Sequence, residues 1–259
     1  MTAMPIRIAA AALLVAGTAT PAAADIVTRS VTYDVDGQSF EGYFAINDGA
    51  GPEQPLVLII HDWDGLTEYE QRRAEMLAEL GYAAFAVDVY GKGVRPTTTE
   101  DKKAESGKLY SDRAALRARL AGGLEAALRM DGVEDDVVVM GYCFGGAAAL
   151  EFARSGADVD GFVTFHGGLG TPDGQDYTNV EAPILILHGS EDPAAPMSQV
   201  ADLVAAMNKD GVDFEVQLYS GARHSFTEWS AKGETSRYDA TADRKSWIAL
   251  LGFLDQQIR

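Results

Sequence analysis

Short apolar runs and longer amphipathic segments alternate along most of the chain. Continuous apolar runs, typical of strands covered on both faces, occupy residues 55–60 and 83–87, and further strand-like runs occupy residues 137–142, 161–165, 183–188 and 214–218. Helix patterns fill residues 68–80, 112–130, 147–154, 196–208 and 238–257. This alternation predicts an α/β fold in which a mostly parallel central sheet carries helices on both faces.

Two segments depart from that alternation. Residues 26–35 and 39–46 alternate between apolar and polar side chains around Asp36-Gly37, which predicts an N-terminal antiparallel hairpin. Residues 91–111 are polar, with the runs Thr97-Thr98-Thr99 and Lys102-Lys103. We expect a loop there with at most a short helix, and this segment is the candidate for a lid.

The first 24 residues are typical of a cleaved signal peptide. Arg7 precedes the apolar residues 8–15, a stretch too short to span a bilayer, and Pro21-Ala22-Ala23-Ala24 ends in a cleavage pattern. The sequence therefore predicts a signal peptide over 1–24 and one large domain over 25–259. It predicts a periplasmic or secreted protein without a membrane span in the mature chain.

Charge and cysteine content narrow the possible partners. The chain carries 21 Lys and Arg against 39 Asp and Glu, for a net charge of −18. Such a surface repels phosphate backbones and anionic lipids, so we expect no nucleic-acid partner. The single cysteine, Cys143, cannot form an internal disulfide, and in an exported protein an unpaired thiol is either buried or used.

The surroundings of Cys143 suggest that the thiol is used. The run Gly141-Tyr142-Cys143-Phe144-Gly145-Gly146 follows an apolar strand and begins a helix pattern, and it reads as a nucleophile elbow with Cys in the usual place of Ser. Such an elbow exposes its central side chain beside backbone N–H groups. The alternative is a cysteine that only fills space in the core. The run does not match the dinucleotide-binding pattern G-x-G-x-x-G.

A nucleophile of this kind needs a base, and the base needs an acid that orients it. On α/β folds that carry such an elbow, the chain order is nucleophile, acid, histidine. Asp192 follows the run 183–188 and His224 follows the run 214–218, so both come from the carboxyl ends of strands. Asp192 is preferred to Glu191. The other histidines, His61, His166 and His188, are expected to have structural roles.

The same reasoning predicts the oxyanion donors and excludes other chemistries. The backbone N–H groups of Trp63, in the turn after the first buried strand, and of Phe144 are the expected oxyanion pair. No pair of His or Cys residues has metal-ligand spacing, so we expect no metal and no cofactor.

Several motifs together resemble those of the dienelactone hydrolase family, whose members have the α/β-hydrolase fold and a Cys-His-Asp triad. They are His61-Asp62-Trp63-Asp64-Gly65-Leu66, Asp88-Val89-Tyr90-Gly91, Gly141–Gly146, Phe165-His166-Gly167-Gly168-Leu169, Leu187-His188-Gly189, His224-Ser225-Phe226 and the stretch 238–247. The resemblance implies hydrolysis of a small carboxylic ester or lactone, with Cys143 as nucleophile, His224 as base and Asp192 as the orienting acid.

The resemblance also marks candidates for contact with the thiol or the substrate: Asp62, Tyr90, Lys92, His166 and Glu228. Three of them depart from the family pattern. Asp62 replaces a Glu that contacts the resting thiol, while Lys92 and Glu228 stand where two arginines clamp a substrate carboxylate. Lys92 cannot form the bidentate contact of an arginine, and Glu228 repels an anion, so a neutral ester or lactone is favoured.

Two alternatives stay open at this point. The fold could serve another acyl hydrolase, such as a thioesterase or a peptidase-like enzyme, because loops choose the substrate. The chain could also be a binding or thiol-sensing protein without turnover.

Overall fold

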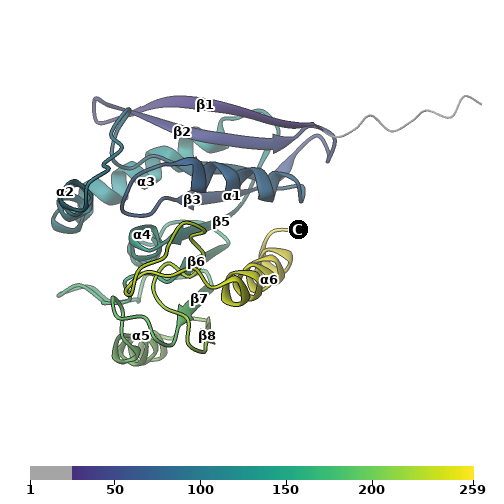
Figure 1. Cartoon of the computed structure of the whole chain (residues 1–259). Helices are drawn as coiled ribbons and strands as arrows, with labels where there is room; N and C mark the ends of the chain where they lie inside the picture. Colours follow the sequence, from purple (N-terminus) through teal and green to yellow (C-terminus); the bar gives the residue numbers. More distant parts are fainter. Residues whose placement is uncertain (1–24) are drawn as a thin grey trace, which may run out of the picture.

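One eight-stranded sheet runs through the molecule, in the order β1-β2-β4-β3-β5-β6-β7-β8 (Figure 1). The computed structural model describes residues 25–259, so the predicted signal peptide lies outside the described residues. The strands are β1 (Ile26–Val35), β2 (Gln38–Asn47), β3 (Gln54–Ile60), β4 (Ala83–Val87), β5 (Val133–Tyr142), β6 (Gly161–Phe165), β7 (Ile184–Gly189) and β8 (Phe214–Tyr219). The hairpin β1-β2 and the pair β2-β4 are antiparallel, and the remaining pairs are parallel.

Helices cover both faces of this sheet, as the alternating pattern predicts (Figure 1). They are α1 (Glu68–Ala78), α2 (Thr99–Ser111), α3 (Arg113–Leu128), α4 (Phe144–Arg154), α5 (Met197–Asp210) and α6 (Ala240–Gln257). One apolar cluster joins the sheet to α1 and α6, and a second joins its other face to α3, α4 and α5. The mostly parallel sheet, the two helical layers and the N-terminal hairpin are thus confirmed.

Strand β3 shows why the central strands are apolar without alternation. Leu56, Leu58 and Ile60 belong to the cluster that includes α4, whereas Val57 and Ile59 belong to the cluster that includes α1. All five side chains are buried. A strand with a core on each side has no solvent face, so both sets of alternate positions must be apolar.

The prediction of a loop over residues 91–111 was wrong in its second half, because α2 is a helix of 13 residues. The side chain of Thr98 caps it by accepting a hydrogen bond from the backbone N–H of Asp101. Only Ser106 and Leu109 are buried in α2, so the segment has almost no apolar stripe. The sequence pattern therefore lacked the periodicity that reveals a helix, and the cap lay inside a run of threonines.

The carboxyl ends of the parallel strands meet at one edge of the sheet. The turn after β3, the junction of β5 with α4, and the loops after β7 and β8 all begin at that edge. Open α/β sheets place their sites there. Among the helices of residues 25–259, none combines the length and the hydropathy needed to cross a membrane.

Candidate active site

Cys143 occupies the sharp turn between β5 and α4. Its backbone has φ +52° and ψ −110°, a conformation that costs free energy for a residue with a side chain. The turn is possible because its neighbours are glycines. A Cβ on Gly145 would lie 2.2 Å from the carbonyl oxygen of Ile60, and one on Gly141 would lie 2.1 Å from that of Gly145. The glycine frame read from the sequence therefore allows α4 to start directly against β3.

The structure brings the three expected triad side chains into one hydrogen-bonded chain. His224 Nε2 lies 3.0 Å from Cys143 Sγ, and His224 Nδ1 lies 2.8 Å from Asp192 Oδ2. The residues come from the β5–α4 turn and from the loops after β7 and β8, although 81 positions separate Cys143 from His224. Cys143 is half-buried, while His224 and Asp192 are buried. This is the geometry of a nucleophile, a base and an orienting acid.

Asp192 is held in place by its own loop. Its Oδ1 accepts hydrogen bonds from the backbone N–H groups of Ala194 and Ala195, which leaves Oδ2 for His224. His188 supports this loop, since its Nε2–H donates to the carbonyl oxygen of Ala195 at 2.8 Å. Glu191, the alternative acid, is exposed and lies 4.0 Å from Arg223. The loop therefore presents Asp192, and not Glu191, to the histidine.

The charges around His224 favour its protonated form. Burial by itself lowers the pKa of His224, but the negative charge of the Cys143 thiolate and the hydrogen bond to Asp192 outweigh it and raise the pKa to about 10. An imidazolium at this position sits between a carboxylate and a sulfur atom. The arrangement can therefore hold a thiolate–imidazolium pair, which is the activated form of a cysteine nucleophile.

The turn after β3 carries the expected oxyanion donor, Trp63. Tyr90 fixes this turn, because its hydroxyl group donates to the carbonyl oxygen of Trp63 at 3.0 Å. His61 also fixes this turn, because its Nδ1–H donates to the carbonyl oxygen of Asp62 and its Nε2 accepts from the N–H of Val89. The sequence marked Tyr90 as a candidate for contact with the substrate. Its side chain is buried, and its hydrogen bond to Trp63 holds the turn in place.

Asp62 lies within a group of three carboxylates beside the thiol. Burial first, and then the nearby Asp64 and Cys143, raise the pKa of Asp62 and favour its neutral form. Burial likewise raises the pKa of Glu70 to about 7. Asp62, Asp64 and Glu70 offer oxygen atoms within 4.8 Å of one another, a donor set that hard cations accept. Protein donors already use these acids, since Glu70 caps α1 through Thr67 and Asp64 pairs with the ammonium group of Lys102 at 3.1 Å.

His166 packs against His224, the candidate base, and does not line an open pocket. Its ring lies 5.3 Å from that of His224, centroid to centroid, and its Nε2 lies 2.8 Å from Thr227 Oγ1. Burial lowers the pKa of His166 well below its ordinary value, so the ring is neutral. Thr227 Oγ1 also accepts from Tyr69, and Arg73 binds the carbonyl oxygen of Thr227. A buried polar network thus supports the floor of the site.

The structure separates the two positions that replace the family's arginines. Glu228 is half-buried, and it lines a cavity of about 500 Å³ together with Asp62, Trp63 and Ser225. Lys92 does not join this group: its ammonium group pairs with Glu41 on β2 at 3.0 Å. The backbone of Lys92 also lies against the N-terminal hairpin, because its N–H donates to the carbonyl oxygen of Ser39 on β2 at 2.9 Å.

Several residues near the site had no place in the sequence interpretation. Lys102 was assigned to a loop, Arg73 was only one position of a helix pattern, and Thr227 belongs to no motif. Glu70 had a usable signal, because Thr67-x-x-Glu70 is a capping box. The buried ion pair of Arg73 with Asp243 joins residues 170 positions apart and left no local trace in the sequence.

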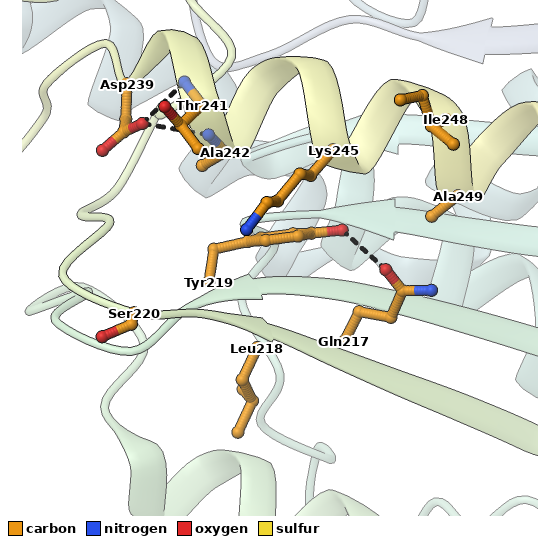
Figure 2. A pocket seen from close by; sticks show the side chains of 10 residues that line it. All are labelled: Gln217, Leu218, Tyr219, Ser220, Asp239, Thr241, Ala242, Lys245, Ile248 and Ala249. Atoms are coloured by element: carbon orange, nitrogen blue, oxygen red, sulfur yellow. Dashed lines mark hydrogen bonds between the residues drawn. The ribbon is translucent and has the colours of Figure 1, made fainter.

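Another cavity, of about 610 Å³, lies between β8 and the first half of α6 (Figure 2). Lys245 and Tyr219 are among its lining residues, which come from β8, α6 and the segments next to them (Figure 2). Neither the triad residues nor the residues of the turn after β3 line it, so it is separate from the candidate active site.

Known proteins resemble this chain in sequence and in structure. The model of the dienelactone hydrolase family matches residues 40–258. The chain belongs to the dienelactone hydrolase family. It is 28% identical to Protein usf of Aquifex pyrophilus over 242 residues, which cover 89% of this chain and 99% of the relative. It is 27% identical to an Aquifex aeolicus protein that bears the name carboxymethylenebutenolidase, with the same shares covered.

Solved structures agree with this membership. The structure called m3DLH is 31% identical, with a TM-score of 0.86, and covers 90% of this chain and 99% of its own. A dienelactone hydrolase-like promiscuous phosphotriesterase from metagenomic libraries is 32% identical, with a TM-score of 0.85, and the shares covered are 90% and 98%. The chain therefore has the α/β-hydrolase fold and is a hydrolase of the dienelactone hydrolase type.

Proposed function

We propose that the chain hydrolyses a small carboxylic ester or lactone through an acyl-enzyme on Cys143. The observation that carries this proposal is the hydrogen-bonded chain from Asp192 through His224 to Cys143, at 2.8 Å and 3.0 Å. It supports a thiol mechanism because it pairs the sulfur atom with a base that a carboxylate orients.

In the proposed first step, the Cys143 thiolate attacks the carbonyl carbon of the substrate. The N–H groups of Trp63 and Phe144 stabilise the oxyanion, and within residues 25–259 neither group has a protein acceptor. The tetrahedral intermediate then collapses, the C–O bond breaks, and His224 gives its proton to the leaving oxygen. An acyl group stays bound to sulfur as a thioester.

In the second step, His224 is neutral and accepts a proton from water as the water attacks the thioester. The C–S bond breaks, the carboxylic acid leaves, and the thiolate–imidazolium pair re-forms. Asp192 keeps its orientation throughout, because the backbone N–H groups of Ala194 and Ala195 donate to its other oxygen atom. A neutral Asp62 beside the sulfur adds no negative charge that would oppose the oxyanion.

A substrate panel tests this proposal against its alternatives. Wild type and Cys143→Ala are assayed side by side with a 4-nitrophenyl ester, a six-membered aromatic lactone, an acyl thioester and a peptide anilide. We expect turnover of the ester or the lactone that Cys143→Ala abolishes, without loss of folded structure by circular dichroism. Faster turnover of the thioester or the anilide would assign the site to another acyl hydrolase.

The non-enzymatic alternative gives a different result in the same experiment. A binding or thiol-sensing protein reacts with iodoacetamide at Cys143 but has no Cys143-dependent turnover to lose. A phosphotriester belongs in the panel too, because a 32% identical relative is named a promiscuous phosphotriesterase. Turnover of that compound alone would replace the carboxylic ester as the substrate.

Export is part of the proposal. The leader pattern of residues 1–24 supports a periplasmic or secreted location. Cell fractionation with N-terminal sequencing tests it: we expect a processed chain that begins at Asp25 outside the cytoplasm. A chain that retains Arg7 and stays in the cytoplasm would contradict it.

A further inference from the structure

Two adjoining cavities form a groove that begins at the candidate active site. The first, of about 500 Å³, is lined at its inner end by Asp62, Trp63 and Ser225, the residue after His224. The second, of about 580 Å³, shares four lining residues with the first, among them Glu68 and Glu228. We call the two cavities together the acidic groove. Each has the volume of a small-molecule site.

Most charges along the acidic groove are already balanced by a partner. Asp64 pairs with Lys102 at 3.1 Å, and Glu75 pairs with Arg72 at 3.0 Å. Asp62 at the inner end is buried among other acids, which favours its neutral form. Lys102 and Arg72, the two basic residues that line the acidic groove, are therefore already paired and do not bind an anion.

Glu68 and Glu228 differ from these acids. Within the described part of the chain, neither carboxylate has a Lys, Arg or His nitrogen within 4.0 Å. One oxygen atom of Glu228 accepts from the N–H and the hydroxyl group of Ser230, and these neutral donors leave its charge uncompensated. Both residues line both cavities, so two net negative charges face the middle of the groove.

An aromatic wall completes the groove. Trp229 is 39% exposed, and its ring packs edge-on against that of Tyr69, which lines both cavities. Arg73 lies against the Trp229 ring, and its charge is balanced by Asp243. Carboxylates combined with aromatic rings are the environment in which proteins bind ammonium groups.

We infer that the substrate is an ester or lactone with an ammonium group, which binds in the acidic groove between Glu68 and Glu228. This inference rests on the proposed function, and it goes beyond a preference for neutral over anionic substrates. The net charge of −18 acts in the same direction, because it raises the concentration of cations near the surface.

Matched pairs of substrates test the inference. In the first pair the charge is on the leaving group: acetylcholine and its carbon isostere, 3,3-dimethylbutyl acetate. In the second pair the charge is on the acyl group: the 4-nitrophenyl esters of 4-(trimethylammonio)butyrate and of 5,5-dimethylhexanoate. Shape is conserved within each pair, so the ratio of kcat/KM reports the positive charge alone.

We expect a ratio of about fivefold in favour of the cation in at least one pair, as two partly exposed charges can supply. The ratio falls toward one in the double variant Glu68→Gln/Glu228→Gln. It is unchanged in the control Glu53→Gln, which alters the charge at the opposite end of β3. Raising the salt concentration from about 0.05 M to about 0.5 M lowers the wild-type ratio without any substitution.

Two results would overturn the inference and leave the proposed function intact. One is Cys143-dependent turnover with both ratios below about twofold, a difference too small for two charge contacts. The other is a ratio that survives in the double variant. Absence of Cys143-dependent turnover for these four compounds and also for the ester and the lactone of the panel would remove the proposed function itself, and the substrate class with it.

Discussion

Substitution of Asp192 by Asn tests the arrangement of the triad most finely, because it changes one atom and little volume. In the wild type, Oδ1 accepts from two backbone N–H groups and Oδ2 faces His224 Nδ1 at 2.8 Å. An amide that keeps its oxygen atom on the backbone donors must turn its NH₂ group toward the histidine. His224 then has to accept at Nδ1 and carry its hydrogen atom on Nε2, directed at the sulfur atom.

That tautomer cannot take a proton from the thiol. Loss of the carboxylate charge also lowers the pKa of His224 from about 10 toward its ordinary value of 6.5, because the hydrogen bond to Asp192 is one of the causes of the increase. General acid–base catalysis of this kind contributes about 10²- to 10⁴-fold to rates. We therefore expect kcat/KM for a 4-nitrophenyl ester to fall by that factor, or about 3–5 kcal/mol of transition-state stabilisation.

The assay compares Asp192→Asn with Glu191→Gln, its neighbour in sequence. Glu191 is exposed and does not contact His224, so its variant should keep wild-type turnover. Circular dichroism and thermal unfolding exclude a general loss of structure. Activity of Asp192→Asn within about threefold of the wild type, far from the expected loss of general base catalysis, would refute the reasoning.

Three further predictions concern other parts of the molecule. Because the folded pKa of His224, about 10, exceeds the ordinary 6.5, its stabilising effect is complete below pH 6.5 and disappears as pH rises through 10. The free energy of unfolding relative to His224→Gln should therefore fall over that range, and a flat difference in urea titrations would count against it. Arg73→Met leaves the Asp243 carboxylate buried without its ionic partner and should lower the free energy of unfolding by about 3–5 kcal/mol. A loss below about 1 kcal/mol is typical of a surface ion pair and would contradict the prediction for this buried pair. Gly145→Ala places a Cβ 2.2 Å from a carbonyl oxygen of β3 and should abolish activity. The control Gly252→Ala, on α6, should keep wild-type activity, because no atom lies within 4 Å of the added Cβ. Equal activities of the two variants would show that the elbow tolerates a side chain.

The sequence reveals this fold where burial is two-sided. The runs at Ala83–Val87 and Gly161–Phe165 match β4 and β6 residue for residue, since a strand with a core on each face is buried at every position and therefore almost free of polar side chains. Helix α2 escaped prediction for the opposite reason, because its few buried side chains leave no periodic pattern. Propensity and capping are weak signals without such a pattern.

The residues of the candidate site also fall into two groups: those that the sequence reveals and those that only the folded structure reveals. Cys143, Asp192 and His224 are readable because the fold fixes their order along the chain and their places after strands. Their supporting partners are not readable, because contacts such as that between Arg73 and Asp243 exist only after α1 and α6 pack on the same face. Lys92 shows a further limit: its position in a motif was clear, but its side chain pairs with Glu41 on β2, a contact that forms only in the folded chain.

Detection of the acyl-enzyme tests the central claim most directly. The protein is mixed with a 4-nitrophenyl ester, quenched with acid during turnover, digested and analysed by mass spectrometry. We predict that the peptide containing Cys143 carries the mass of one acyl group, and that this adduct decays at the rate of product formation after the ester is exhausted. Sustained turnover with an unmodified Cys143, accompanied by full activity of Cys143→Ala, would contradict the mechanism.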